Sequence, residues 1–178
     1  MIKIREMRLT EADKIKHIDR SERIEAIYRM EAGQLIEERA GHECPNWNDK
    51  QTQELITRFT TELNRGGTAY GAFVQERLVG FGVLAGQFRG RNQDRLQVDL
   101  MYVTREYRRQ GIGTQIMEKL SDEALKRGAR YLYISSTETE SAVQFYRSNG
   151  SELTEDKDTE LYEMEPYDIH MIKKLRDG

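Results

Sequence analysis

Cysteine is nearly absent from this sequence, because Cys44 is the single thiol among 178 residues. One thiol excludes an internal disulfide and a thiolate metal cluster, so we expect Cys44 to be a small side chain in or beside a loop. The three histidines, His17, His42 and His170, are scattered, and none has a second histidine or a cysteine at the spacing of a metal site. The sequence therefore predicts no bound metal.

Long hydrophobic runs and an excess of basic charge are also missing. No stretch approaches the roughly 20 apolar residues that cross a membrane, and the first residues lack the apolar run of a signal peptide. The formal charge is −3, whereas nucleic-acid binders usually carry a basic patch. We therefore predict one cytoplasmic domain over residues 1–178, with neither a membrane nor a nucleic acid as its partner.

Hydrophobic spacing predicts a mixture of strands and helices without an internal repeat, as in an α/β fold. Within the strand expected at 93–103, strict alternation places Gln97 and Asp99 on one face and Val98 and Leu100 on the other. The expected elements are a strand at 2–7, one or two short helices carrying Ile15, Ile18, Ile24 and Ile27, a hairpin at 28–36, a helix at 50–64 capped by Asp49, strands at 68–74, 78–87 and 93–103, a helix from Ile112 to Gly128, a strand at 131–134, a helix at 141–148 and a strand at 169–172.

A glycine loop, Arg108–Gly113, lies between the strand that ends at Val103 and the amphipathic helix that follows. The first turn of a helix has N–H groups without internal partners, and the helix dipole adds positive charge there. Gly111 and Gly113 lack a Cβ atom, so a ligand oxygen can approach the backbone closely, and Arg108 and Arg109 add positive charge nearby. The loop therefore predicts a site for a phosphate group.

Two common phosphate-binding motifs fail at this loop. No Gly-Lys-Ser/Thr sequence ends it, which argues against a P-loop hydrolase. Ile116 occupies the place of the third glycine of a dinucleotide-binding fingerprint. On the loop alone, a helix that simply begins after a glycine turn is an equally good interpretation.

Two segments resemble motifs of the GCN5-related N-acetyltransferase (GNAT) superfamily. Residues 103–113 resemble its main cofactor motif, R/Q-x-x-G-x-G/A after a strand that ends in valine, and residues 142–150 resemble its second signature, A-x-x-F/L-Y-x-x-x-G. The resemblance implies an α/β (α+β) fold with a mixed, mostly antiparallel sheet of about seven strands flanked by helices. It also implies a splayed strand pair at the cofactor site, and residues 28–48 as a hairpin insertion on the acceptor side.

The resemblance further implies that acetyl-coenzyme A is the acyl donor. Its pantetheine arm would bind the strand backbone before the loop, and its pyrophosphate would lie on the amides of the loop and the first helical turn. Thr139 stands where the family often has an asparagine that contacts the pantetheine arm. The predicted cofactor-binding residues are Met101, Tyr102, Val103, Arg108, Arg109, Gln110, Gly111, Ile112, Gly113, Thr114 and Thr139.

Two catalytic residues follow from the resemblance. Tyr146 would donate a proton to the departing coenzyme A thiolate; the alternative is an aromatic side chain that packs beside Phe145. An amine must be neutral to attack a thioester, and Asp99 lies at a position where family members often carry a base, whereas Gln97 cannot accept the proton. The alternative for Asp99 is a solvated or salt-bridged carboxylate.

The implied function is N-acetylation of a primary amine on a small molecule. Acidic and aromatic residues of the N-terminal third, including Tyr28 and Trp47, would suit a cationic acceptor, although acidic helix faces are more often only solvated. A non-catalytic acyl-coenzyme A sensor and a protein or peptide N-acetyltransferase remain alternatives. The splayed strands of this fold commonly support dimers, so a homodimer also stays open.

Overall fold

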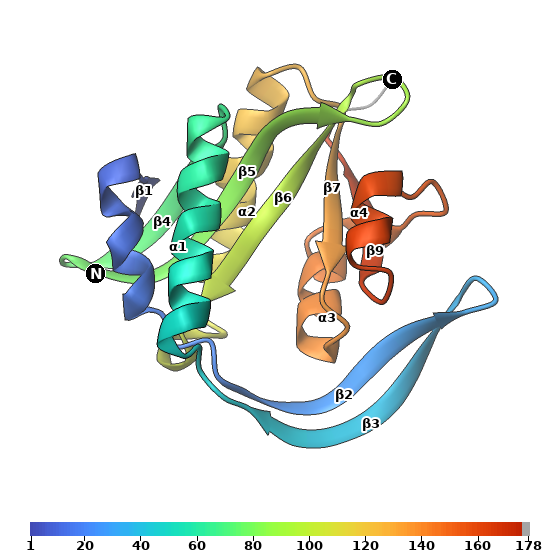
Figure 1. The fold of residues 1–178 in the computed structure, drawn as a ribbon, viewed down its shortest axis with the longest axis horizontal. Helices are drawn as coiled ribbons and strands as arrows, with labels where there is room; N and C mark the ends of the chain where they lie inside the picture. Colours follow the sequence, from blue (N-terminus) through green and yellow to red (C-terminus); the bar gives the residue numbers. More distant parts are fainter. Residues whose placement is uncertain (176–178) are drawn as a thin grey trace.

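A computed structural model of the chain describes residues 1–175 (Figure 1). Its strands are β1 (Ile2–Glu6), β2 (Glu22–Glu31), β3 (Gln34–Cys44), β4 (Thr68–Val74), β5 (Arg77–Arg89), β6 (Arg95–Val103), β7 (Tyr131–Ser136), β8 (Ser151–Leu153) and β9 (Ile169–Lys174). Its α-helices are α1 (Asp49–Asn64), α2 (Ile112–Lys126), α3 (Glu140–Ser148) and α4 (Thr159–Met164), and two 3-10 helices are η1 (Leu9–His17) and η2 (Arg105–Tyr107).

One mixed sheet organises these elements in the order β1-β4-β5-β6-β7-β9-β8. Every neighbouring pair in this sheet is antiparallel except β6 and β7, which run parallel. Helices α1 and η1 lie on one face of the sheet and α2 on the other (Figure 1). The predicted fold class, a mostly antiparallel sheet of about seven strands flanked by helices, is confirmed.

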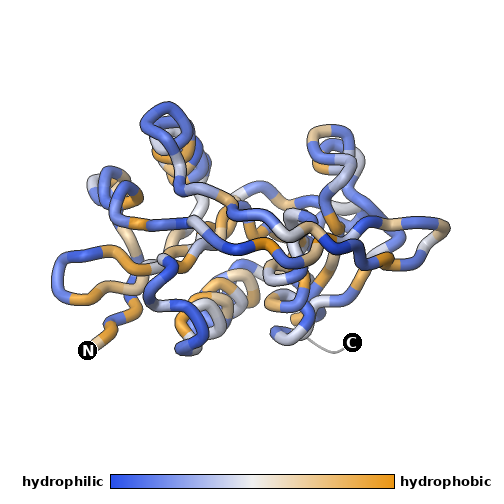
Figure 2. Tube along the Cα trace, turned by 90° about the horizontal axis from the view of Figure 1, so that it is seen from below, coloured by the Kyte–Doolittle hydropathy of each residue, from blue (hydrophilic) through white to orange (hydrophobic). Residues whose placement is uncertain are grey.

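Each helix buries one side against the sheet. In α2 the residues at helical spacing, Ile112, Ile116, Leu120 and Ala124, are almost fully buried. Phe59 of α1 is fully buried on the opposite face. Hydrophobic and hydrophilic residues accordingly alternate along the helices in Figure 2. The sheet thus has a separate hydrophobic core on each face. The candidate functional site lies where strands β6 and β7 diverge.

The segment after η1 differs from the prediction. Ile24 and Ile27 lie in β2, so the prediction of a helix there is wrong; Ile24, Ala26 and Tyr28 are buried at every second position, which is the period of a strand. The hairpin predicted at 28–36 is confirmed and is longer, since β2 pairs with β3 from Glu22 to Cys44. We call this hairpin, residues 22–44, the strap.

The cap of α1 also differs by one residue. Asn48, rather than Asp49, is the N-cap: its side chain accepts from Gln51 N at 2.8 Å, and Gln51 Oε1 accepts from Asn48 N at 3.0 Å. This reciprocal pair is a capping box, which satisfies two backbone donors at once. Asp49 instead supplies negative charge to the first turn.

A β-bulge at Asp99, in the pairing of β5 with β6, lies where β6 leaves β7. Leu100 pairs with Val83 and Val98 with Leu84, so Asp99 has no partner residue on β5. An extra residue of this kind bends a strand and disturbs its ladder. The parallel pairing of β6 with β7 ends at Val98, and the two strands then diverge (Figure 1). Strict alternation along 93–103 is therefore wrong at Asp99, whereas the predicted splayed pair is present.

The strap crosses below the open ends of β6 and β7 and reaches α3 (Figure 1). Tyr28 N donates to Glu138 O at 2.6 Å, and Gln144 Nε2 donates to the Tyr28 hydroxyl at 2.7 Å. A backbone bridge also joins Ile27 to Thr139. The strap therefore links the part of the chain around η1 to the far side of the splay.

Candidate functional site

The backbone of β6 is exposed along its last residues, where the strand has left β7. Thr104 N donates to Val79 O on β5 at 2.8 Å, and peptide groups alternate in direction along an antiparallel strand. The backbone of Tyr102 therefore faces β5, whereas the N–H and C=O groups of Met101 and Val103 face the gap. The Val103 C=O also accepts from Arg108 Nε at 2.9 Å, so the two N–H groups and the C=O of Met101 are what this edge offers to an extended ligand that carries amide groups.

The N-terminus of α2 lies just beyond this edge and has no side-chain cap. Asn48, Thr139 and Asp158 each accept from the first turn of α1, α3 and α4. Gly111 is the N-cap of α2 and offers no side chain, and the first turn contains no acidic residue. The N–H groups of residues 112–114 therefore lack an intrahelical partner. Together with the helix dipole they favour an anion at this end.

The two glycines of the loop are needed for different reasons. Gly111 has φ of +82° with open space around the position of a Cβ atom, so its role is conformational. A Cβ atom on Gly113 would lie 2.8 Å from Cε1 of Phe145. Gly113 therefore lets α2 approach α3, which differs from the predicted reason of making room for a ligand oxygen.

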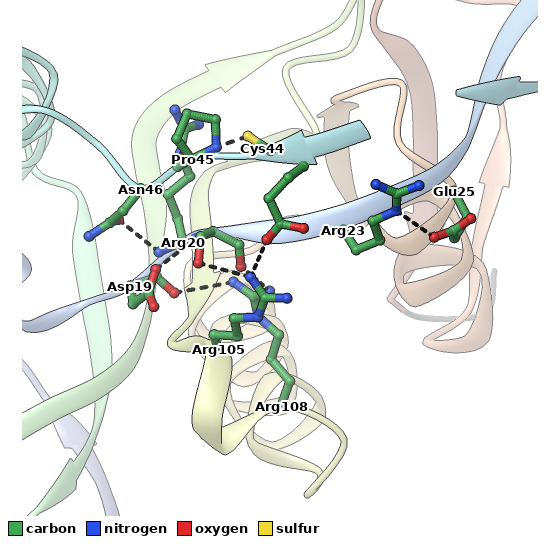
Figure 3. Close-up of polar contacts among 11 residues, drawn as sticks. Asp19, Arg20, Arg23, Glu25, Cys44, Pro45, Asn46, Arg105 and Arg108 are labelled. Atoms are coloured by element: carbon green, nitrogen blue, oxygen red, sulfur yellow. Dashed lines mark hydrogen bonds and ion pairs between the residues drawn. The ribbon is translucent and has the colours of Figure 1, made fainter. Parts of the chain in front are cut away.

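Arg108 forms three hydrogen bonds to backbone carbonyl groups. Its Nε donates to Val103 O at 2.9 Å and its Nη1 to Ser21 O at 2.8 Å. Its Nη2 donates to Asp19 O at 3.3 Å (Figure 3). Burial lowers the pKa of Arg108. The side chain thus fixes the end of β6 to the start of the strap. Arg109 is exposed, with φ of +63°, and is the arginine of this pair that is open to solvent.

Arg105 forms a second clamp at the same place. Its backbone N donates to Asp19 O at 2.9 Å, and its guanidinium pairs with Glu43 at the end of the strap (Figure 3). The buried hydroxyl of Thr104 accepts from Asp19 N at 2.8 Å. The chain before the loop and both ends of the strap are therefore held as one unit.

Tyr146 lies on α3, with its ring edge-on to Phe145 at 5.2 Å between centroids. Its hydroxyl has no hydrogen-bond partner among residues 1–175. Burial raises the pKa of Tyr146, and the nearby Tyr102 and Asp168 raise it further. The phenol therefore keeps its proton at neutral pH and has it free to donate.

Asp99 is held in a salt bridge. Arg58 of α1 donates from Nε to Asp99 Oδ2 at 3.0 Å and from Nη2 to Asp99 Oδ1 at 2.5 Å. The Asp99 side chain is only 6% exposed. Both carboxylate oxygens are thus occupied, which is the alternative considered for this residue. Its two hydrogen bonds are charge-assisted and fix the bulge against α1.

Asp168, just before β9, is a titratable group of the splay that the sequence did not reveal. Its Oδ2 accepts from Ser135 Oγ at 2.8 Å, and Ser135 lies on β7 beyond the last residue paired with β6. Burial is the largest cause that raises the pKa of Asp168 to about 6. Its charge raises the pKa values of Tyr146 and Tyr102. No motif surrounds this residue, because its partners are distant in sequence.

A cavity of about 230 Å³ opens beside the bulge on the α1 side. Trp47 lines it and lies edge-on to the ring of Tyr102, at 4.9 Å between centroids. Arg58, which binds Asp99, lines it as well. The remaining lining residues are Arg20, Gln51, Glu54 and Leu55. The cavity thus adjoins the splay from the face opposite α2.

Thr139 and two of the histidines form hydrogen bonds within the fold. Thr139 caps α3 by accepting from Ala142 N at 3.4 Å. His17 Nδ1 accepts from the backbone of Leu78, and His170 Nδ1 bonds the Tyr133 hydroxyl at 2.7 Å. Among residues 1–175 there is no cluster of His, Cys, Asp or Glu that would hold a metal. Over the same residues, no helix is both long and apolar enough to cross a membrane.

Comparison with known proteins finds a matching family, a relative of part of the chain and structures of similar fold. The Acetyltransferase (GNAT) family matches residues 24–150. N-alpha-acetyltransferase 50 of Danio rerio is 34% identical over 86 residues, which are 47% of this chain and 51% of the relative, so the match spans about half of that protein. A nourseothricin acetyltransferase structure superposes with a TM-score of 0.74 at 22% identity, covering 98% of this chain and 99% of the other. A putative streptothricin acetyltransferase from Bacillus anthracis in complex with acetyl coenzyme A gives 0.73 at 18% identity, covering 98% of each chain.

Proposed function

The chain belongs to the acetyltransferase (GNAT) family, and on this basis we propose that it transfers the acetyl group of acetyl-coenzyme A to a primary amine of a small molecule. One observation carries the proposal: the uncapped N-terminus of α2 adjoins a free edge of β6. The first suits a pyrophosphate and the second suits the amide groups of a pantetheine arm. The coenzyme A molecule contains both groups, with the pantetheine arm following the pyrophosphate.

In this proposal, the donor lies along the gap between β6 and β7. The backbones of Met101 and Val103 bind the pantetheine arm, and the amides from Arg109 to Thr114 bind the pyrophosphate. Arg109 adds charge from solvent, and Arg108 acts indirectly by holding the end of β6. The open conformation of Gly111, with nothing near a Cβ position, supports this placement.

Tyr146 is proposed as the general acid. Its phenol is protonated, lacks a partner and is close enough to Tyr102 on β6 for their charges to interact. Protonating the departing sulfur avoids expelling a free thiolate, a contribution that general acids make to the transition state.

The cavity of about 230 Å³ beside Trp47 is proposed to receive a small acceptor. Two proteins of similar fold over nearly the full chain are named for acetylating nourseothricin and streptothricin. The second candidate is N-alpha-acetylation of a protein, supported by the 34% identity to N-alpha-acetyltransferase 50.

The test measures release of free coenzyme A and the mass of the product with three acceptors: nourseothricin, spermidine and a tetrapeptide with a free N-terminus. We expect a higher kcat/KM with a small amine than with the tetrapeptide. A preference for the tetrapeptide would support the protein-modifying alternative. Tight acetyl-coenzyme A binding without acetylation of any amine would support the sensor.

A further inference from the structure

The proposed reaction needs a proton acceptor, and the residue first expected to supply it is already engaged. Amines are mostly protonated at pH 7 and must lose a proton before they attack a carbonyl carbon. Asp99 directs both carboxylate oxygens to Arg58. A second carboxylate, Asp168, lies just before β9 and is hydrogen-bonded to Ser135, in the part of β7 that has left β6.

Asp168 is fixed at the β7 side of the splay by two contacts. Its backbone N donates to Glu165 O at 3.2 Å, which closes the turn after α4. Ser135 Oγ donates to Oδ2 at 2.8 Å. Its other oxygen, Oδ1, has no hydrogen-bond partner among residues 1–175, and the side chain is only partly buried. One oxygen is therefore anchored and the other is free.

The charged and titratable groups around Asp168 come from several elements. Glu165 and Glu138 raise its pKa, whereas Arg58 and the Ser135 hydroxyl lower it, and burial outweighs them. Its charge also acts on Tyr102 of β6 and on Tyr146 of α3. His170, two residues along the chain, is turned to Tyr133 and to Glu165 O and takes no part. Asp168 and Tyr146 are thus near enough to influence each other electrostatically.

We infer that Asp168 is the general base that accepts the proton of the acceptor amine, directly or through one water molecule. The inference rests on the proposed function. Asp168 takes one proton from the ammonium group, and the freed electron pair forms the C–N bond. As the C–S bond breaks, the sulfur takes the proton of Tyr146, and the second proton lost by nitrogen restores the phenol. The proton on Asp168 then passes to solvent.

A carboxylate of this kind suits the task better than an ordinary one. With a pKa of about 6, Asp168 is still mostly ionised at pH 7, yet it binds a proton more strongly than an exposed aspartate. Its negative charge also attracts an ammonium group into the gap. The same residue therefore orients the acceptor amine and deprotonates it.

The experiment compares pH profiles of kcat with acetyl-coenzyme A and saturating nourseothricin or spermidine, whichever the wild-type enzyme acetylates faster. The variants are Asp168→Asn, Ser135→Ala and, as the matched control, Asp99→Asn. Isothermal titration with acetyl-coenzyme A checks that each variant still binds the donor.

We expect the wild-type acidic limb to fall near pH 6. Asp168→Asn should bind acetyl-coenzyme A as before, lose about 10²-fold in kcat and lose the limb. Ser135→Ala should move the limb to higher pH, because the hydroxyl lowers the pKa of Asp168; a purely structural role would not move it. Asp99→Asn should keep the limb in place, whatever its rate.

Two negative outcomes are distinguishable. If the wild-type enzyme acetylates amines but Asp168→Asn keeps both the limb and the rate, Asp168 is not the base and only this inference fails. If the wild-type enzyme acetylates none of the probe amines, the proposed function fails and this inference fails with it.

Discussion

Tyr146 is a phenol that its surroundings keep protonated. Burial raises its pKa above the ordinary value of 10, so an acid role would add no alkaline limb to the pH–rate profile below about pH 10. We expect Tyr146→Phe to lower kcat about 10²-fold and to leave the KM for acetyl-coenzyme A unchanged. Steady-state kinetics measure both.

Tyr70→Phe, on β4 in the same core, is the control and should keep the wild-type kcat. If Tyr146→Phe has the same kcat as this control, the acid role is excluded.

At the scale of single residues, the sequence allowed prediction of the candidate site residues that belong to short motifs. Gly111 and Tyr146 sit in local patterns whose spacing is read directly from the chain. The state of Asp99 depends on Arg58, 41 residues away, and that of Asp168 on Ser135, 33 residues away. Such pairs form only when the sheet is assembled. A carboxylate's chemistry is therefore hidden from the sequence wherever its partner is distant.

At the scale of elements, Gly113 sets how closely α2 packs on α3. A Cβ atom there would lie 2.8 Å from the Phe145 ring, so Gly113→Ala should lower the free energy of unfolding by about 1–3 kcal/mol. Urea unfolding measures the loss. Adding Phe145→Leu should restore part of it, because the smaller side chain makes room. An alanine variant as stable as wild type would show that the two helices shift freely.

The contact between β1 and η1 rests on an ion pair. Arg5 bonds both oxygens of Glu11 and is the largest cause that lowers the pKa of Glu11 from 4.5 to about 2. Since the folded-state pKa is the lower one, ionised Glu11 stabilises the protein above about pH 4.5, and this stability is lost as pH falls toward 2.

We therefore expect Glu11→Gln to lower the free energy of unfolding by about 1–2 kcal/mol at pH 7, a value reduced for partial exposure. The deficit should shrink between pH 5 and pH 3, as measured by urea unfolding. Glu76→Gln is the control, because the Glu76 side chain is 94% exposed. A deficit that stays constant with pH would contradict the ion-pair explanation.

Element boundaries were predictable where one period dominates and failed where two compete. Strand β4 was predicted at its observed bounds, since turn residues flank it on both sides. Ile15 and Ile18 fit a helical period that Ile24 and Ile27 extend, so β2 was mistaken for helix. The bulge at Asp99 leaves no mark in the sequence, because any polar residue fits the expected alternation there. The splay itself followed from the family resemblance.

For the molecule as a whole, the sheet opens into two parts that share one hydrophobic core but only a short strand pairing. Pairing of β6 with β7 joins them over residues 95–98 and 131–134 only. Beyond that, the strap ties one part to the other through Tyr28, which bonds Glu138 and Gln144. A ligand lying in the splay would contact both parts, so binding should resist their separation.

We therefore expect acetyl-coenzyme A to stabilise the whole fold. At about 100 times its Kd, a ligand that binds only the folded state adds about 2.7 kcal/mol, which raises Tm by about 5–10 °C for a chain of this size. Differential scanning fluorimetry measures the shift. Gly111→Val should lower the Tm without ligand and also abolish the shift, because valine does not adopt the φ of +82° that presents the α2 amides. An equal shift in that variant would mean that the donor binds elsewhere than at the loop.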